Sequence, residues 1–200
     1  MKKTALLVVF LITAFNSMEA QESDYSFSDS YTVDTSSSLA ISSFDSNVEV
    51  IAHDRGTIEV HYKIKRGNQI LKLSKKELEE AITGQSRLDI FTSGNEVKIE
   101  MVSLVKNYID FDDKIIIDFK VYAPKATMSK IFTNDGDISL MGLDLDQTCI
   151  TNDGYIRLTD LAGSITAQTN DADIILKNVT GRVDGETNDG SIIDLSKDDK

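Results

Sequence analysis

Hydrophobic positions recur every 18 residues in the last third of the chain. The first column consists of Ile138, Ile156, Ile174 and Ile192, and the column two positions further on contains Leu140, Leu158 and Leu176. A fixed period with apolar columns is typical of a solenoid, because each repeat buries its apolar face against the next repeat. The pattern therefore predicts that residues 133–195 obtain their core by stacking.

A polar tetrad opens each repeat. Thr-Asn-Asp-Gly begins at Thr133, Thr151 and Thr187, whereas the tetrad at Thr169 ends in Ala172. Hexapeptide coils do not fit, since Gln168 and Glu186 stand at positions that would have to be apolar. Two short strands in each 18-residue coil fit better, because Ile165 and Val183 follow nine residues after apolar positions. We expect glycine to supply positive φ at the tight corners between these strands.

The upstream part is less regular but rich in β patterns. Residues 43–50 resemble a degenerate repeat, in which Val48 and Val50 correspond to Ile138 and Leu140. Longer strands are predicted where apolar and polar residues alternate, at Thr57–Lys65, Arg87–Phe91, Glu96–Met101 and Lys114–Tyr122. Ser74 and Glu77 have the spacing of a capping box, which predicts one short helix over residues 75–83.

These patterns predict an all-β fold. We expect a right-handed parallel β-solenoid with 18-residue coils, longer N-terminal strands and one short inserted helix. The predicted division has five parts: a signal peptide at 1–20, a flexible segment at 21–38, the N-terminal β-rich part at 39–132, the repeats at 133–195 and a charged tail at 196–200.

The first twenty residues indicate export. Lys2 and Lys3 precede an apolar run that ends at Phe15, which is too short for a membrane span and is typical of a signal peptide. Cleavage is expected after Ala20. A second apolar stretch of membrane-spanning length is missing from the sequence, so we expect an exported protein without a transmembrane anchor, in the periplasm, on the cell surface or outside the cell.

The repeat motif carries a family resemblance. Thr-Asn-Asp-Gly-x-Ile-x-Leu recurs at 18 residues, after Asn-Val-Glu-Val at 47–50 and Val-Tyr-Ala-Pro at 121–124. Together these motifs resemble the putative-adhesin family of exported bacterial β-strand-repeat proteins, formerly a domain of unknown function, over residues 38–195. The resemblance implies a right-handed β-solenoid, and it carries over no catalytic residues.

The net charge and the reactive residues limit the classes of function that fit the sequence. The formal charge is −12, which argues against nucleic acid as a partner, since phosphate binding needs clustered Lys and Arg. The single cysteine, Cys149, falls at an inward position and is expected to fill the core. His53 and His61 lack the spacing of a zinc site, so we predict neither a catalytic nor a metal centre.

Three sets of residues are candidates for binding. Asp137, Tyr155, Arg157 and Asp173 should share one outer face, as a binding site or as an ordinary solvated sheet. The amides of Asn134, Asn152, Asn170 and Asn188 should form a structural ladder, with a ligand-binding row as the alternative. Asp135, Asp153, Asp171 and Asp189 should be solvated, with calcium between neighbouring carboxylates as the alternative.

The sequence thus favours a non-enzymatic, adhesin-like binding or structural module of the bacterial envelope. Its partner would be an envelope glycan or protein, and the module should be a monomer. A β-helix enzyme that acts on polysaccharide, as a lyase or a hydrolase, is the alternative. Such an enzyme would need a concave groove with convergent carboxylates.

Overall fold

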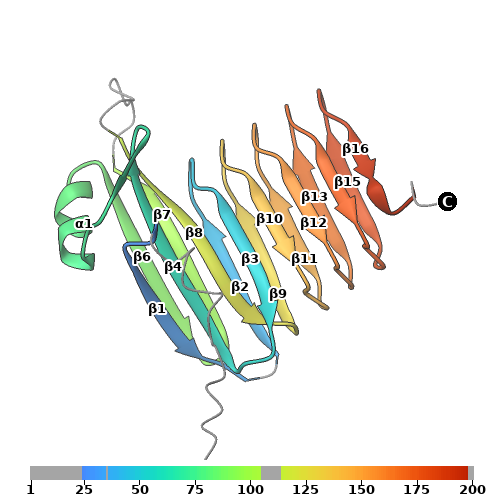
Figure 1. Cartoon of the computed structure of the whole chain (residues 1–200), viewed down its shortest axis with the longest axis horizontal. Helices are drawn as coiled ribbons and strands as arrows, with labels where there is room; N and C mark the ends of the chain where they lie inside the picture. Colours follow the sequence, from blue (N-terminus) through green and yellow to red (C-terminus); the bar gives the residue numbers. More distant parts are fainter. Residues whose placement is uncertain (1–23, 35, 105–113, 198–200) are drawn as a thin grey trace, which may run out of the picture.

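The structure is a computed structural model, and it describes residues 24–34, 36–104 and 114–197. The predicted signal peptide and its cleavage site lie outside these residues. Within them the chain is all-β with one short helix, as predicted, and its strands lie side by side along the long axis (Figure 1). The described part contains no helix that is both long enough and apolar enough to cross a membrane.

The strands form two sheets. In spatial order, sheet A consists of β1 (Phe27–Thr32), β4 (Thr57–Arg66), β8 (Ile115–Pro124), β3 (Val48–His53), β10 (Ile138–Met141), β12 (Ile156–Thr159), β14 (Ile174–Lys177) and β16 (Ile192–Asp194), with β5 (Gln69–Leu71) paired to β4. Sheet B consists of β15 (Val183–Thr187), β13 (Ile165–Thr169), β11 (Gln147–Ile150), β9 (Thr127–Phe132), β2 (Ser37–Ser42), β7 (Glu96–Ser103) and β6 (Ser86–Ser93).

The two sheets share one hydrophobic core. Alternation along each strand turns every second side chain inward, so Ile138 and Ile156 of sheet A join Ile131 and Cys149 of sheet B in the same cluster. All four are fully buried. The core therefore comes from stacked apolar columns, as the periodicity predicted.

The register in the repeats follows the sequence period. Ile138 pairs in parallel with Ile156, Ile156 with Ile174, and Ile174 with Ile192. On the upstream side Ile138 pairs with Val48, which confirms that residues 43–50 are a degenerate repeat. Ile192 departs from the prediction of a buried column, because no described strand lies beyond β16 and its side chain is 48% exposed.

The sheets are mixed rather than wholly parallel, which corrects the predicted parallel solenoid. β4 runs antiparallel to both β1 and β8, and β6 runs antiparallel to β7. These longer strands stand at the N-terminal end of the stack, where α1 (Lys75–Ile82) also lies (Figure 1). Ser74 and Glu77 form the predicted capping box at the start of α1.

The segment at 21–38, for which flexibility was predicted, contains strand β1. β1 forms six antiparallel pairs with β4, from Phe27–Tyr62 to Thr32–Thr57. The Phe27 ring also stacks on the buried Tyr62 ring with centroids 4.5 Å apart. Sequence composition suggested mobility because serine and aspartate dominate the segment, but pairing with β4 outweighs composition.

The tetrad glycines act through close packing rather than through positive φ, which corrects the prediction for these corners. At the opposite corners the prediction is confirmed for Gly142 and Gly163, whose φ values are 77° and 82°. The non-glycine residues Asp160 and Asn178 also have positive φ. At Gly136 the backbone carbonyl of Ser46 lies so close that a Cβ atom would stand 1.8 Å from its oxygen. The tetrad favours glycine at this corner because the preceding layer occupies most of the space of a side chain.

Candidate functional site

A row of polar side chains crosses the outer face of sheet A. Cross-strand pairing places His61 beside Lys120, Lys120 beside Glu49, Glu49 beside Ser139, and Ser139 beside Arg157. Their inward neighbours are buried, so these residues face outward by alternation. We call this set, His61, Lys120, Glu49, Ser139 and Arg157, the central row.

Three of the four predicted binding residues meet at one end of the central row. The Arg157 guanidinium lies 2.8 Å from the Asp137 carboxylate, and its centre lies 4.9 Å from the centroid of the Tyr155 ring. The Asp137 carboxylate also accepts the Tyr155 N–H at 2.9 Å. Asp137 and Tyr155 therefore hold Arg157 in a defined position on the surface.

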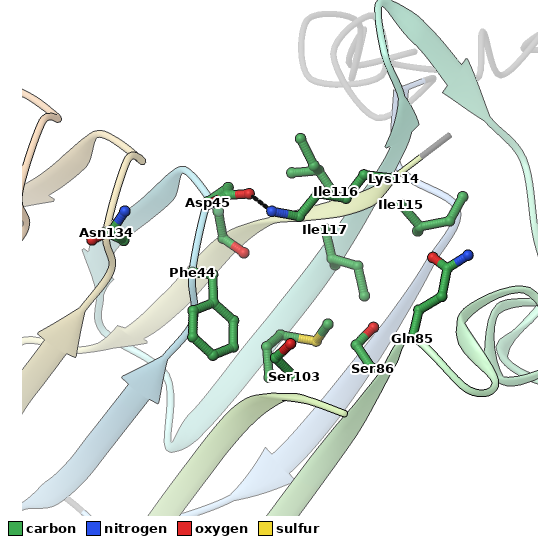
Figure 2. A pocket seen from close by; sticks show the side chains of 12 residues that line it. Phe44, Asp45, Gln85, Ser86, Ser103, Lys114, Ile115, Ile116, Ile117 and Asn134 are labelled. Atoms are coloured by element: carbon green, nitrogen blue, oxygen red, sulfur yellow. Dashed lines mark hydrogen bonds and ion pairs between the residues drawn. The ribbon is translucent and has the colours of Figure 1, made fainter. Parts of the chain in front are cut away.

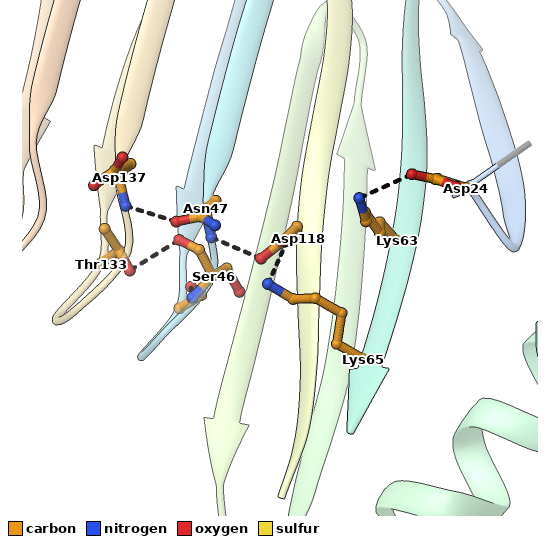
Figure 3. Close-up of polar contacts among 9 residues, drawn as sticks. Asp24, Ser46, Asn47, Lys63, Lys65, Asp118, Thr133 and Asp137 are labelled. Carbon is orange, nitrogen blue, oxygen red and sulfur yellow. Dashed lines mark hydrogen bonds and ion pairs between the residues drawn. The ribbon is translucent and has the colours of Figure 1, made fainter. Parts of the chain in front are cut away.

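Asp173 lies two layers beyond Asp137 on the same edge of sheet A and caps the backbone of the next layer as Asp137 does. Its carboxylate accepts the Ser191 N–H of the next layer at 2.9 Å. The same arrangement occurs upstream, where Asp118 accepts the Asn47 N–H at 3.0 Å and Asn47 accepts the Asp137 N–H at 2.9 Å (Figure 3). At this position a side-chain oxygen commonly caps the backbone of the following layer.

The four tetrad asparagines stack along another edge. Asn188 Nδ2 donates to Asn170 Oδ1 at 2.9 Å, and Asn170 Nδ2 donates to Asn152 Oδ1. Asn134 and Asn152 instead donate to the neighbouring carboxylates of Asp135 and Asp153. The backbone joins the column as well, since Asn152 N–H donates to the Asn134 carbonyl at 2.8 Å.

The threonines of the tetrads have a structural role that sequence reasoning missed. Each hydroxyl reaches two carbonyls of the layer behind, as Thr151 does with Asn134 at 3.0 Å and Gly136 at 3.1 Å. The fixed first position of the tetrad was the signal that could have revealed this role.

An aromatic cluster at the other end of the central row was also missed. His61 lies between Tyr25 and Tyr122, with ring centroids 5.6 and 5.5 Å away and steep interplanar angles of 70° and 80°. Lys120 stands 5.6 Å from the Tyr122 ring and 3.3 Å from the Glu49 carboxylate. Burial lowers the pKa of Lys120, but Glu49 outweighs burial and the net shift is upward.

A separate pocket of about 240 Å³ lies near the tetrad corners (Figure 2). Apolar side chains line much of it, among them Phe44, Met101 and Ile117. Asp45 and Lys114 form an ion pair on its wall. The paired charges leave this pocket with mainly apolar character.

The potentially reactive residues Cys149 and His53 have the surroundings of structural residues. Cys149 is fully buried, and burial raises the pKa of its thiol well above the ordinary range. Burial and the nearby Arg55 lower the pKa of His53, whose Nδ1 accepts the Arg55 N–H at 3.0 Å. In the ranges that the structure describes, no three His, Cys, Asp or Glu side chains gather as metal ligands would.

Comparison with known proteins gave three solved structures. They are described as a putative cell adhesion protein from Clostridium sporogenes (7% identity, TM-score 0.41), a putative adhesin from Parabacteroides merdae (11%, 0.22) and a putative adhesin from Bacteroides fragilis (8%, 0.23). Each comparison covers 84% of this chain, and the shares of the other chains are 98%, 95% and 96%. No family model and no curated protein matches the chain.

The descriptions of these structures name the same kind of protein as the family resemblance of the repeat motif.

Proposed function

We propose that the protein is a non-enzymatic binding module of the bacterial cell envelope, built on a right-handed β-solenoid of 18-residue coils. Its binding surface is the outer face of sheet A, and its partner is an envelope glycan or protein. The observation that carries the proposal is the central row, in which hydrogen-bonding side chains from separate strands form one continuous strip with tyrosine rings at both ends.

The fixed positions of the side chains support binding. Asp137 and Tyr155 hold Arg157, and Glu49 holds Lys120, so these groups lose little additional freedom when a ligand arrives. Arginine and tyrosine are also the residue types that contribute most at binding hot spots.

The polysaccharide-acting enzyme is the weaker alternative. Its minimum is a pair of convergent carboxylates, one of which acts as acid and the other as base or nucleophile. Asp137 and Asp173 cap the backbone of different layers, and Asp137 also binds Arg157. These contacts favour structural roles for both carboxylates.

Retention on isolated bacterial envelopes tests the proposal. The purified protein should sediment with the envelopes, and Arg157→Ala should reduce retention, because the substitution removes the cation and the stacking plane from the outer face of sheet A. The matched control is Lys130→Ala, which removes a cation from the exposed face of β9 in sheet B. Equal retention of both variants, or no retention of the unaltered protein, would contradict the proposal.

A further inference from the structure

The outer face of sheet A contains a shallow groove of about 290 Å³ beside the aromatic cluster. Tyr25 stands at one end as an aromatic wall. Two lines of polar side chains cross the strands β8, β3 and β10: Lys120, Glu49 and Ser139 form one line, and Asp118, Asn47 and Asp137 form the other. Two strand spacings separate β8 from β10, so each line is about 10 Å long.

The charges in this groove are balanced. Lys120 pairs with Glu49 at 3.3 Å, and Asp137 pairs with Arg157 at 2.8 Å. The remaining pairs join Lys65 to Asp118 at 2.6 Å and Lys63 to Asp24 at 3.2 Å (Figure 3). An anionic ligand would have to displace a carboxylate from each ammonium group, in a chain whose formal charge is −12. A cationic ligand would have to displace the lysines.

The polar groups nevertheless offer many hydrogen-bonding positions. The Glu49 carboxylate keeps 43% of its side-chain surface exposed, and the Asp137 carboxylate keeps 41%. Carboxylate oxygens have more lone pairs than one ion pair uses, so they can also accept hydrogen bonds from hydroxyl groups. The Ser139 hydroxyl and the Asn47 amide add groups that can donate as well as accept.

Tyr25 is well anchored. Its carbonyl accepts a hydrogen bond from Lys72 Nζ at 3.0 Å, and the next residue, Ser26, donates its N–H to the Tyr62 carbonyl at 2.8 Å. Burial raises the pKa of the Tyr25 phenol, and Lys120 opposes that shift, as expected for a ring packed beside the ammonium group. A fixed ring with an apolar face and a polar edge suits the C–H face of a sugar ring.

From this geometry we infer that the groove between Tyr25 and Asp137 binds an uncharged oligosaccharide. One sugar ring would stack on Tyr25, and its hydroxyl groups would bond to the two polar lines. The inference rests on the proposed function and narrows it from an envelope glycan or protein to a neutral glycan, at a place distinct from the Tyr155–Arg157 stack.

Calorimetric titration of the purified protein tests this inference. The probes are three uncharged trisaccharides, those of N-acetylglucosamine, glucose and mannose, and the trimer of galacturonate as the anionic counterpart. At least one uncharged trimer should bind in the millimolar range or tighter, and the galacturonate trimer should bind more weakly. Tyr25→Ala should weaken binding about tenfold, because it removes the stacking surface.

Two further variants exclude loss of folding as the cause. Ser139→Tyr should block the groove by filling it from β10, although it removes no aromatic contact. Phe132→Ala removes an exposed aromatic ring from β9 in sheet B, away from the groove, and should leave the dissociation constant within about twofold. Equal effects of Tyr25→Ala and Phe132→Ala, tightest binding of galacturonate, or no binding of any uncharged trimer would each overturn the inference.

Envelope retention separates this inference from the proposed function. If envelopes retain the protein while the uncharged trimers do not bind, the groove is assigned wrongly and the envelope function stands. If the trimers bind and envelopes do not retain the protein, the groove is a sugar site and the envelope function fails.

Discussion

Gly154 lies directly against the carbonyl group of Gly136, and a Cβ atom at Gly154 would stand 2.0 Å from that oxygen. Gly154→Ala should therefore force the two layers apart and lower the free energy of unfolding by about 1–3 kcal/mol, as overpacking does. Ala172 at the equivalent corner is 7% exposed, which indicates that one methyl group can be accommodated and that the cost is finite.

Urea unfolding measures this cost. Gly94→Ala is the control, because a Cβ atom at Gly94 would meet no atom beyond its chain neighbours within 4 Å, and only the positive φ of 56° opposes the change. A stability loss at Gly154 no larger than that at Gly94 would contradict the close-packing role.

The isoleucine column offers a matched pair for the core. Ile156 is fully buried, whereas Ile192, two layers further on, is 48% exposed. Ile156→Ala should cost about 2–5 kcal/mol, because it leaves a cavity between the sheets. Ile192→Ala should cost less than about 1 kcal/mol, since little buried surface is lost. Equal losses in chemical denaturation would show that the register is wrong.

Asp135, in the column of tetrad aspartates, predicts a pH effect on stability. The pKa of Asp135 is raised, first by burial and then by the neighbouring Asp45 and Asp153. Its ionisation therefore opposes folding. This penalty is complete above the folded-state pKa, shrinks as the pH falls through that pKa, and vanishes below the unfolded-state value of about 3.9.

Asp135→Asn should accordingly raise the melting temperature at pH 7, and its advantage should disappear in acid. Asparagine keeps the side-chain oxygen that accepts the Asn134 amide. Asp184→Asn, on the exposed face of β15, is the control for a general change in charge. A pH-independent gain at Asp135, or an equal gain at Asp184, would refute the electrostatic explanation.

The aspartate column also allows a test for calcium. If the carboxylates are solvated, millimolar calcium and sodium of equal ionic strength should shift the melting temperature alike, by screening. A bridging cation would instead stabilise the fold by about 2.7 kcal/mol at a hundredfold excess over its dissociation constant. A calcium-specific shift that Asp153→Asn abolishes would contradict the prediction of solvated carboxylates.

The repeats were predictable because their core is periodic. Each isoleucine column position pairs with the next one, so the sequence period is the spatial register. The antiparallel end was not predictable in this way, since β4 and β6 contain no repeat that could indicate their partners. The tetrad glycines were misinterpreted because close approach of a neighbouring layer and positive φ both select glycine.

Only the part of the candidate site that lies in the repeats was predicted from the sequence. Asp137 belongs to one sequence repeat and Tyr155 and Arg157 to the next, so the period alone indicated that they meet. Tyr25 and Tyr122 are far apart in the sequence and meet through His61, so their cluster depends on the pairing of β4 with β8. Alternation in Lys114–Tyr122 was the one available signal, because it turns Lys120 and Tyr122 outward.

Radical footprinting of the envelope-bound protein tests whether the outer face of sheet A is the binding face. Met141 on sheet A and Met128 on sheet B are matched reporters, with exposed fractions of 42% and 46%. Envelope binding through the outer face of sheet A should reduce oxidation of Met141 and Tyr155 and leave Met128 and Phe132 unchanged. Protection of Met128 and Phe132, or oxidation of Met141 at the rate of the free protein, would contradict the assignment of the binding face.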